Sequence, residues 1–125
     1  MKETKLIDVQ ALQEEAKNSE HKESYRVLER SRNYRIGVGA RLASSGQPSF
    51  FFEVLIYLCP NSSRADISLL EKDLMFLREL QARGYSLSCQ DDSCISCETT
   101  VPPQNLATEY GTINSITKRI FQKQK

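Results

Sequence analysis

Apolar and polar side chains alternate from residue 34 onward, and this is the clearest pattern in the chain. The apolar positions of the alternation are Tyr34, Ile36, Val38, Ala40 and Leu42. A period of two residues is typical of a strand that buries one of its faces. Residues 43–49 are small or polar and include Gly46 and Pro48, so the pattern predicts a turn and a returning strand.

The returning strand, over residues 50–59, is apolar on both faces apart from Glu53. One face carries Phe50, Phe52, Val54, Ile56 and Leu58, and the other carries Phe51, Leu55 and Tyr57. An antiparallel sheet with one face in water needs only one apolar face. The second apolar face therefore predicts a cover, which is either the N-terminal helix or a second subunit, because large exposed apolar patches usually mark interfaces.

Helical spacing replaces the alternation in residues 64–83. Ser63 precedes Asp66 by three positions, as in a capping box, and Gly84 supplies a C-terminal stop. The apolar stripe of this segment is Ile67, Leu70, Leu74, Leu77 and Leu80. Its intervals of three and four residues predict a helix that buries the leucines.

The C-terminal part repeats the order of hairpin and helix. Strands are predicted over 85–90 and 93–101, joined by a turn at Asp91 and Asp92. Prolines at 102 and 103 end the second strand. The stripe of the final helix is Leu106, Tyr110, Ile113, Ile116 and Ile120.

The first 32 residues are highly charged and are predicted to be helical. Their first apolar stripe is Leu6, Val9, Leu12 and Ala16. After a polar stretch over 17–24, Tyr25 and Leu28 form a second, shorter stripe. The pattern leaves open whether this segment is one helix or two.

Together these elements predict a single α+β domain over residues 1–125. It consists of the charged helical segment 1–32 and a ββαββα core over 34–125. Two hairpins separated by a helix favour a two-layer fold with one antiparallel four-stranded sheet and with helices packed mainly on one face.

Composition and charge narrow the class of protein. The 125 residues include 17 Lys and Arg against 16 Asp and Glu, so the formal net charge is +1. This balance argues against a dedicated nucleic-acid or membrane-surface binder. No apolar run approaches the roughly 20 residues of a membrane span. Met1 is followed by charged residues rather than by an apolar signal segment, so we expect a cytoplasmic protein.

Three of the four cysteines, Cys89, Cys94 and Cys97, lie within nine residues. Such clustering suits a thiolate zinc site or a redox site. In a hairpin with a two-residue turn, however, Cys89 lies opposite Cys94 while Cys97 points to the other face. We therefore expect buried or half-exposed thiols and no cofactor, with zinc binding or thiol redox chemistry through this cluster as the alternative.

A second candidate site is the face of the first hairpin that points away from the core. Its proposed residues are Arg35, Arg41, Phe51, Glu53, Leu55 and Tyr57. Glycines at 37 and 39 would let aromatic rings lie flat over the backbone, and arginines would pair with Glu53 across strands. The same residue types can stack the bases of single-stranded nucleic acid, although Glu53 would stand in the middle of such a groove.

The sequence favours a small protein-interaction or regulatory domain without catalytic machinery. We expect self-association through the hairpin 34–59, because this hairpin has a second apolar face to bury. The alternatives are a metal or thiol protein that uses the cysteine cluster and, less favoured by the charge, a weak binder of single-stranded nucleic acid.

Overall fold

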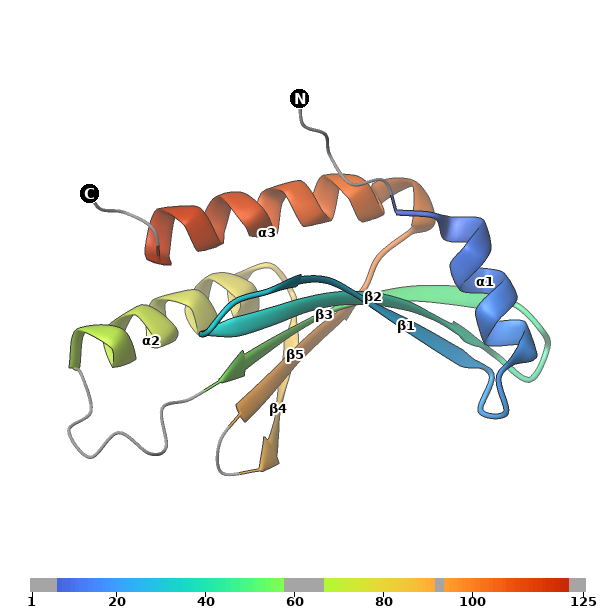
Figure 1. Ribbon diagram of the computed structural model, residues 1–125, viewed down its shortest axis with the longest axis horizontal. Helices are drawn as coiled ribbons and strands as arrows, with labels where there is room; N and C mark the ends of the chain where they lie inside the picture. Colours follow the sequence, from blue (N-terminus) through green and yellow to red (C-terminus); the bar gives the residue numbers. More distant parts are fainter. Residues whose placement is uncertain (1–6, 58–66, 92–93, 122–125) are drawn as a thin grey trace.

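The computed structural model describes residues 7–57, 67–91 and 94–121 and has an α+β fold (Figure 1). The element order is α1 (Val9–Asn18), β1 (Glu23–Arg30), β2 (Tyr34–Leu42), β3 (Pro48–Tyr57), α2 (Ile67–Ala82), β4 (Ser86–Asp91), β5 (Cys94–Thr100), a 3-10 turn (Pro103–Asn105) and α3 (Leu106–Phe121). The predicted fold class is confirmed.

The sheet has five antiparallel strands in the order β1-β2-β3-β5-β4. The prediction of four strands is wrong because residues 23–30 form a strand rather than part of a helix. This segment pairs with β2 from Glu23–Arg41 to Arg30–Arg35 and becomes an edge of the sheet. Charged side chains are common on edge strands, where they discourage pairing with further chains, so the high charge is compatible with a strand here.

A β-bulge between Val27 and Glu29 shifts the register of β1. The shift turns the Glu29 carboxylate toward the helices, where it accepts hydrogen bonds from the hydroxyls of Tyr34 and Tyr110 at 2.9 and 3.0 Å. The bulge thereby connects the first strand to the last helix.

The core lies between the helices and one face of the sheet, which we call the inner face (Figure 1). It contains the described members of the apolar sets predicted for β2 and β3, together with residues of α1, α2 and α3. Leu58 of the β3 set lies outside the described residues. Its largest fully buried apolar side chains are Tyr34, Phe52, Phe76, Leu12, Ile36, Ile56, Leu80, Leu106 and Ile113. Helix α1 joins the same layer, since the Ser24 hydroxyl donates a 2.8 Å hydrogen bond to the carbonyl of Leu12.

The buried face of helix α2 differs from the predicted leucine stripe. Phe76 and Leu80 are buried, whereas the side chain of Leu74 is 58% exposed. The prediction therefore chose the wrong inward residue in this turn, because an aromatic ring fills more of the core than a leucine. The predicted start of the helix, residues 63–66, lies outside the described residues, as do the side chains of Ile67 and Leu70.

Within the described ranges, no helix has the length and apolar character needed to cross a membrane. The cytoplasmic location stays a prediction.

Candidate functional site

The face of the sheet opposite the helices, which we call the outer face, carries the residues predicted from the first hairpin. Alternation places Arg35, Gly37, Gly39 and Arg41 of β2 there, and the register aligns them with Leu55, Glu53, Phe51 and Ser49 of β3. All three helices contribute to the single core on the inner face. Among the described residues, the outer face is therefore covered only by its own side chains.

Two glycines allow aromatic rings to lie against the backbone of β2. A Cβ atom at Gly37 would lie 2.1 Å from the hydroxyl oxygen of Tyr25, and one at Gly39 would lie 2.5 Å from Cζ of Phe51. The two rings are nearly parallel, with centroids 6.4 Å apart and an interplanar angle of 15°. The predicted packing of rings over glycines is confirmed, with Tyr25 of β1 as the additional ring.

Both arginines of β2 lie over these rings. The guanidinium carbon of Arg41 lies 4.1 Å from the centroid of Phe51, and that of Arg35 lies 5.4 Å from the centroid of Tyr25. Such cation–π contacts stabilise by roughly 0.5–1 kcal/mol at exposed sites. They also fix the orientation of two side chains that would otherwise be mobile.

Carboxylates on neighbouring strands neutralise the arginines. Arg41 donates to Glu98 at 2.6 Å and lies 3.4 Å from Glu23, and Arg35 lies 3.6 Å from Glu53. The pairing between Arg35 and Glu53 confirms the predicted cross-strand ion pair. Because a carboxylate lies beside each guanidinium, little net positive charge remains for phosphate groups.

Burial and charge also perturb the tyrosine of this layer. Burial raises the pKa of Tyr25 to about 12, and the carboxylate of Glu53 adds to the rise. Its hydroxyl therefore stays protonated at any physiological pH and serves as a hydrogen-bond donor rather than as a base.

The apolar residues of this face are largely covered. Phe51 is 4% exposed and Leu55 is 8% exposed, while Tyr25 and Arg41 above them are partly open to solvent. From the neighbouring strand β5, the hydroxyl of Ser96 donates a 3.0 Å hydrogen bond to the carboxylate of Glu53. The outer face is consequently a mixed surface of rings, paired charges and hydroxyls rather than a bare apolar patch.

Of the six predicted residues, Arg35, Arg41, Phe51, Glu53 and Leu55 lie together on this face, and Tyr57 lies at its far end opposite Cys94. Three contributors to this face were not predicted from the sequence: Glu23, Tyr25 and Glu98. The first two belong to the segment 1–32, which was predicted to be mainly helical, with Glu23 in its polar stretch. The alternation of Glu23, Tyr25 and Val27 is the signal that could have placed them in a strand.

The cysteine cluster does not form one site. An irregularity after Cys89 pairs that residue with Ile95 and pairs Asp91 with Cys94, so the expected pairing of Cys89 with Cys94 is wrong. A shift of one position moves a side chain to the other face. Cys89 is exposed, Cys94 is partly buried and Cys97 is buried in the core. Of the predicted turn, Asp91 belongs to β4, and Asp92 lies outside the described residues, as does Cys59.

No group of three His, Cys, Asp or Glu side chains that could hold a metal ion occurs in the described part of the chain. Burial raises the pKa of Cys97 to about 12, and the nearby carboxylate of Glu53 acts in the same direction. A thiol with a raised pKa is a poor nucleophile and a poor metal ligand. Zinc binding and redox chemistry stay predictions that this geometry does not support.

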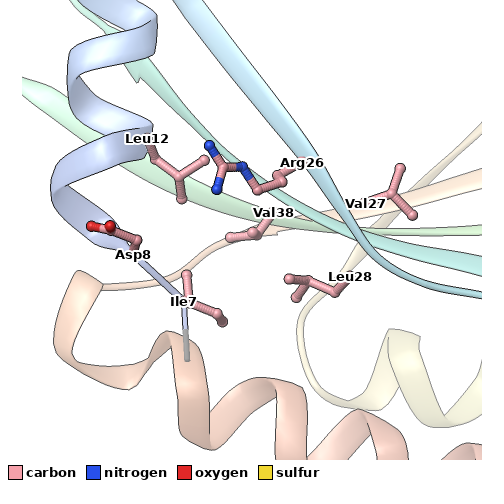
Figure 2. Close-up of a pocket in the computed structure, with 7 residues that line it drawn as sticks. All are labelled: Ile7, Asp8, Leu12, Arg26, Val27, Leu28 and Val38. Carbon is pink, nitrogen blue, oxygen red and sulfur yellow. The ribbon is translucent and has the colours of Figure 1, made fainter. Parts of the chain in front are cut away.

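A pocket of about 300 Å³ lies between α1, β1 and β2 (Figure 2). Its lining residues are Ile7, Asp8, Leu12, Arg26, Val27, Leu28 and Val38. The two charged side chains both have structural roles, since Asp8 caps α1 through the Ala11 amide and Arg26 pairs with Glu15. Because both charged side chains are already engaged within the fold, the outer face is the stronger candidate.

Comparison with protein-family models, with curated proteins and with solved structures finds no match to this chain.

Proposed function

We propose that the chain is a protein-interaction domain and that a folded protein partner docks on the outer face. The observation that carries this proposal is the layer of Tyr25, Phe51 and Arg41, which is stacked, ion-paired and left uncovered by the helices. Tyrosine, phenylalanine and arginine are enriched at protein interfaces, where such anchors supply much of the binding energy.

Preorganisation supports the same proposal. Arg35 and Arg41 are held by both a ring and a carboxylate, so a partner does not have to immobilise them on binding. Each side chain that is already ordered saves roughly 0.5–1.5 kcal/mol of the entropic cost of association. The fitting partner surface is flat and carries aromatic or aliphatic side chains that stack on Tyr25 and Arg41.

Charge distinguishes this partner from nucleic acid. The outer face carries two arginines and three carboxylates, and each arginine is paired with at least one of the three. A phosphate backbone would have to displace these carboxylates, whereas a protein surface with both signs of charge would not. Self-association through the hairpin 34–59 stays a prediction, which an adduct between two copies of the chain would support.

Photo-crosslinking tests the docking. In cells that naturally express the protein, a photoreactive phenylalanine analogue is placed at position 25, where the native Tyr25 is partly exposed. The control carries the same analogue at position 10 of α1, where the native Gln10 is exposed. We expect a discrete protein adduct from position 25 and none from position 10. The captured protein, once purified, should bind the unmodified chain and lose at least about tenfold in affinity on Thr100→Arg.

Thr100 is suited to this test because it is exposed and lies opposite Phe51 on β5. A matched control is Lys17→Glu on α1, which changes the net charge without touching the outer face. An absence of adducts, an affinity unaffected by Thr100→Arg, or an adduct with nucleic acid would overturn the proposal. An adduct between two copies of the chain would replace the foreign partner with the self-association predicted from the sequence.

A further inference from the structure

Helix α2 carries the most exposed apolar side chains of the described residues. Leu74 is 58% exposed and Met75 is 48% exposed, and both lie on the side of α2 opposite the buried Phe76 and Leu80. The next most exposed large apolar side chains, those of Tyr25 and Leu87, are each only 37% exposed. An apolar helix face of this kind costs free energy in water unless it is covered.

The apolar pair is flanked by two opposite charges at equal distances. Glu71 precedes Leu74 by three residues, and Arg78 follows Met75 by three residues. Positions 71, 74, 75 and 78 share one face because they are spaced by three, four and seven residues. We call these four residues the α2 stripe.

Neither charge of the α2 stripe is neutralised by a residue that the structure describes. Glu71 and Arg78 make no ion pair with any residue that the structure describes, whereas the neighbouring Glu79 is paired with Arg119 of α3 at 3.1 Å. Two shallow hollows, of about 300 and 280 Å³, lie along the stripe, and Met75 and Arg78 line both. The stripe thus offers projecting apolar side chains, adjacent hollows and two unused charges of opposite sign.

We propose that two copies of the chain pair through α2, with the helices antiparallel about a two-fold axis midway between Leu74 and Met75. This arrangement places Leu74 of each copy beside Met75 of the other and lets these side chains enter the facing hollows. It also brings Glu71 of each copy to Arg78 of its partner, since both lie three and a half positions from the axis. The same patch is used twice, as a two-fold interface requires.

The pairing is independent of the partner docking proposed above, because the α2 stripe and the outer face lie on opposite sides of the fold. A pair formed through α2 leaves two outer faces open. Charge complementarity selects a second copy as the occupant: an antiparallel copy satisfies both charges at once, and a parallel one would place like charges side by side.

Charge reversal in sedimentation experiments tests the pairing. The unmodified chain should sediment as a monomer–dimer equilibrium between about 1 and 100 μM, the range in which small interfaces dissociate. Glu71→Arg alone and Arg78→Glu alone each place like charges together at both ends of the stripe. Each should raise the dissociation constant of the dimer at least about tenfold.

Mixing the two variants gives the decisive result. In a mixed pair, both contacts again join opposite charges, so an equimolar mixture of Glu71→Arg and Arg78→Glu should recover the dimer that each variant alone has lost. This recovery also shows that both variants are folded. Lys17→Glu and Thr100→Arg, which change charge elsewhere, should dimerise like the unmodified chain.

Three results would each overturn the α2 pairing. They are a monomer at every concentration, single variants that dimerise normally, and a mixture that stays monomeric. If Thr100→Arg alone abolished the dimer, the chain would instead self-associate through the outer face. The first three results leave capture of a foreign partner by position 25 untouched, so the two proposals fail separately.

Discussion

On the outer face, Gly39 lies close to both a backbone carbonyl and an aromatic ring. A Cβ atom there would lie 2.2 Å from the carbonyl oxygen of Ser24 and 2.5 Å from the ring of Phe51. At Gly37 the three nearest atoms all belong to the end of the Tyr25 side chain. A backbone carbonyl cannot move aside without breaking the sheet, whereas a partly exposed tyrosine can swing into solvent.

Alanine substitutions at the glycines should therefore differ in their effect on the free energy of unfolding. We expect Gly39→Ala to lower the free energy of unfolding by about 1–3 kcal/mol, as overpacking does, and Gly37→Ala to cost less. Gly111→Ala in α3, where nothing lies within 4 Å of the added atom, should instead stabilise by about 1 kcal/mol. Urea denaturation checks all three. A neutral Gly39→Ala would mean that the rings do not pack on β2 as described.

Cysteine reactivity offers a second test at this scale. Burial raises the pKa of Cys97 to about 12, and Cys89 is exposed. We expect iodoacetamide at pH 8 to modify Cys89 in the folded chain and to reach Cys97 only after unfolding. Peptide mass spectrometry over time measures both rates. Equal rates would revive the thiol chemistry considered for this cluster.

At the scale of the elements, α2 has a charged group on its buried side. The side chain of Asp73 is 2% exposed, and its Oδ1 atom has no hydrogen-bond partner in the described structure. Burial raises the pKa of this carboxyl from 3.8 to about 6. The folded chain therefore holds the proton more tightly than the unfolded chain, so the folded state is relatively favoured at low pH, and this stability is lost as pH rises through about 6.

Asp73→Asn should remove this pH dependence. Because the amide resembles the protonated acid, we expect the variant to be more stable than the unmodified chain by about 1–3 kcal/mol at pH 7.5, the usual cost of an unsatisfied buried group. The difference should shrink as pH falls below 6 and vanish near 3.8. Thermal unfolding at several pH values checks this, with Glu14→Gln on the exposed face of α1 as the control. A constant difference would contradict the buried charge.

Some elements could be predicted from the sequence more completely than others. The strand β2, the face alternation of β3 and the stripe of α3 follow from local periodicity, which the sequence contains directly. The strand β1 could not be assigned in this way, because its few apolar residues are stabilised by pairing with β2 and by the ring contact of Tyr25 with Phe51. The register at Cys89 depends on an irregularity between Cys89 and Asp91, and a one-residue difference there decides which thiols share a face.

The candidate site was predictable in part for the same reason. Arg35, Arg41, Phe51, Glu53 and Leu55 belong to one hairpin, so the period of two places them on one face. The residues that cover and neutralise them come from β1 and β5, and sequence alone does not show which strands become neighbours. The face that was expected to be covered by the N-terminal helix or by a second subunit is instead a layer of rings and ion pairs, with α1 packed on the inner face.

At the scale of the whole molecule, the outer face should not bind nucleic acid. Its two arginines are paired with Glu23, Glu53 and Glu98. We expect no change in fluorescence anisotropy when a labelled single-stranded oligothymidylate is titrated at about 50 mM salt, where phosphate contacts are strong. Binding that weakens steeply with added salt would instead identify the arginines as phosphate ligands.

The two proposals combine into one account, in which copies join through α2 and present their outer faces to partners on opposite sides. Pulsed electron paramagnetic resonance between spin labels at position 100, attached through an unnatural amino acid, tests this most directly. Two helix–sheet layers joined at a helix interface should separate the labels by about 30 Å or more, since each packed layer adds about 10 Å. Labels within about 15 Å would mean that the sheets face each other, and would contradict the account.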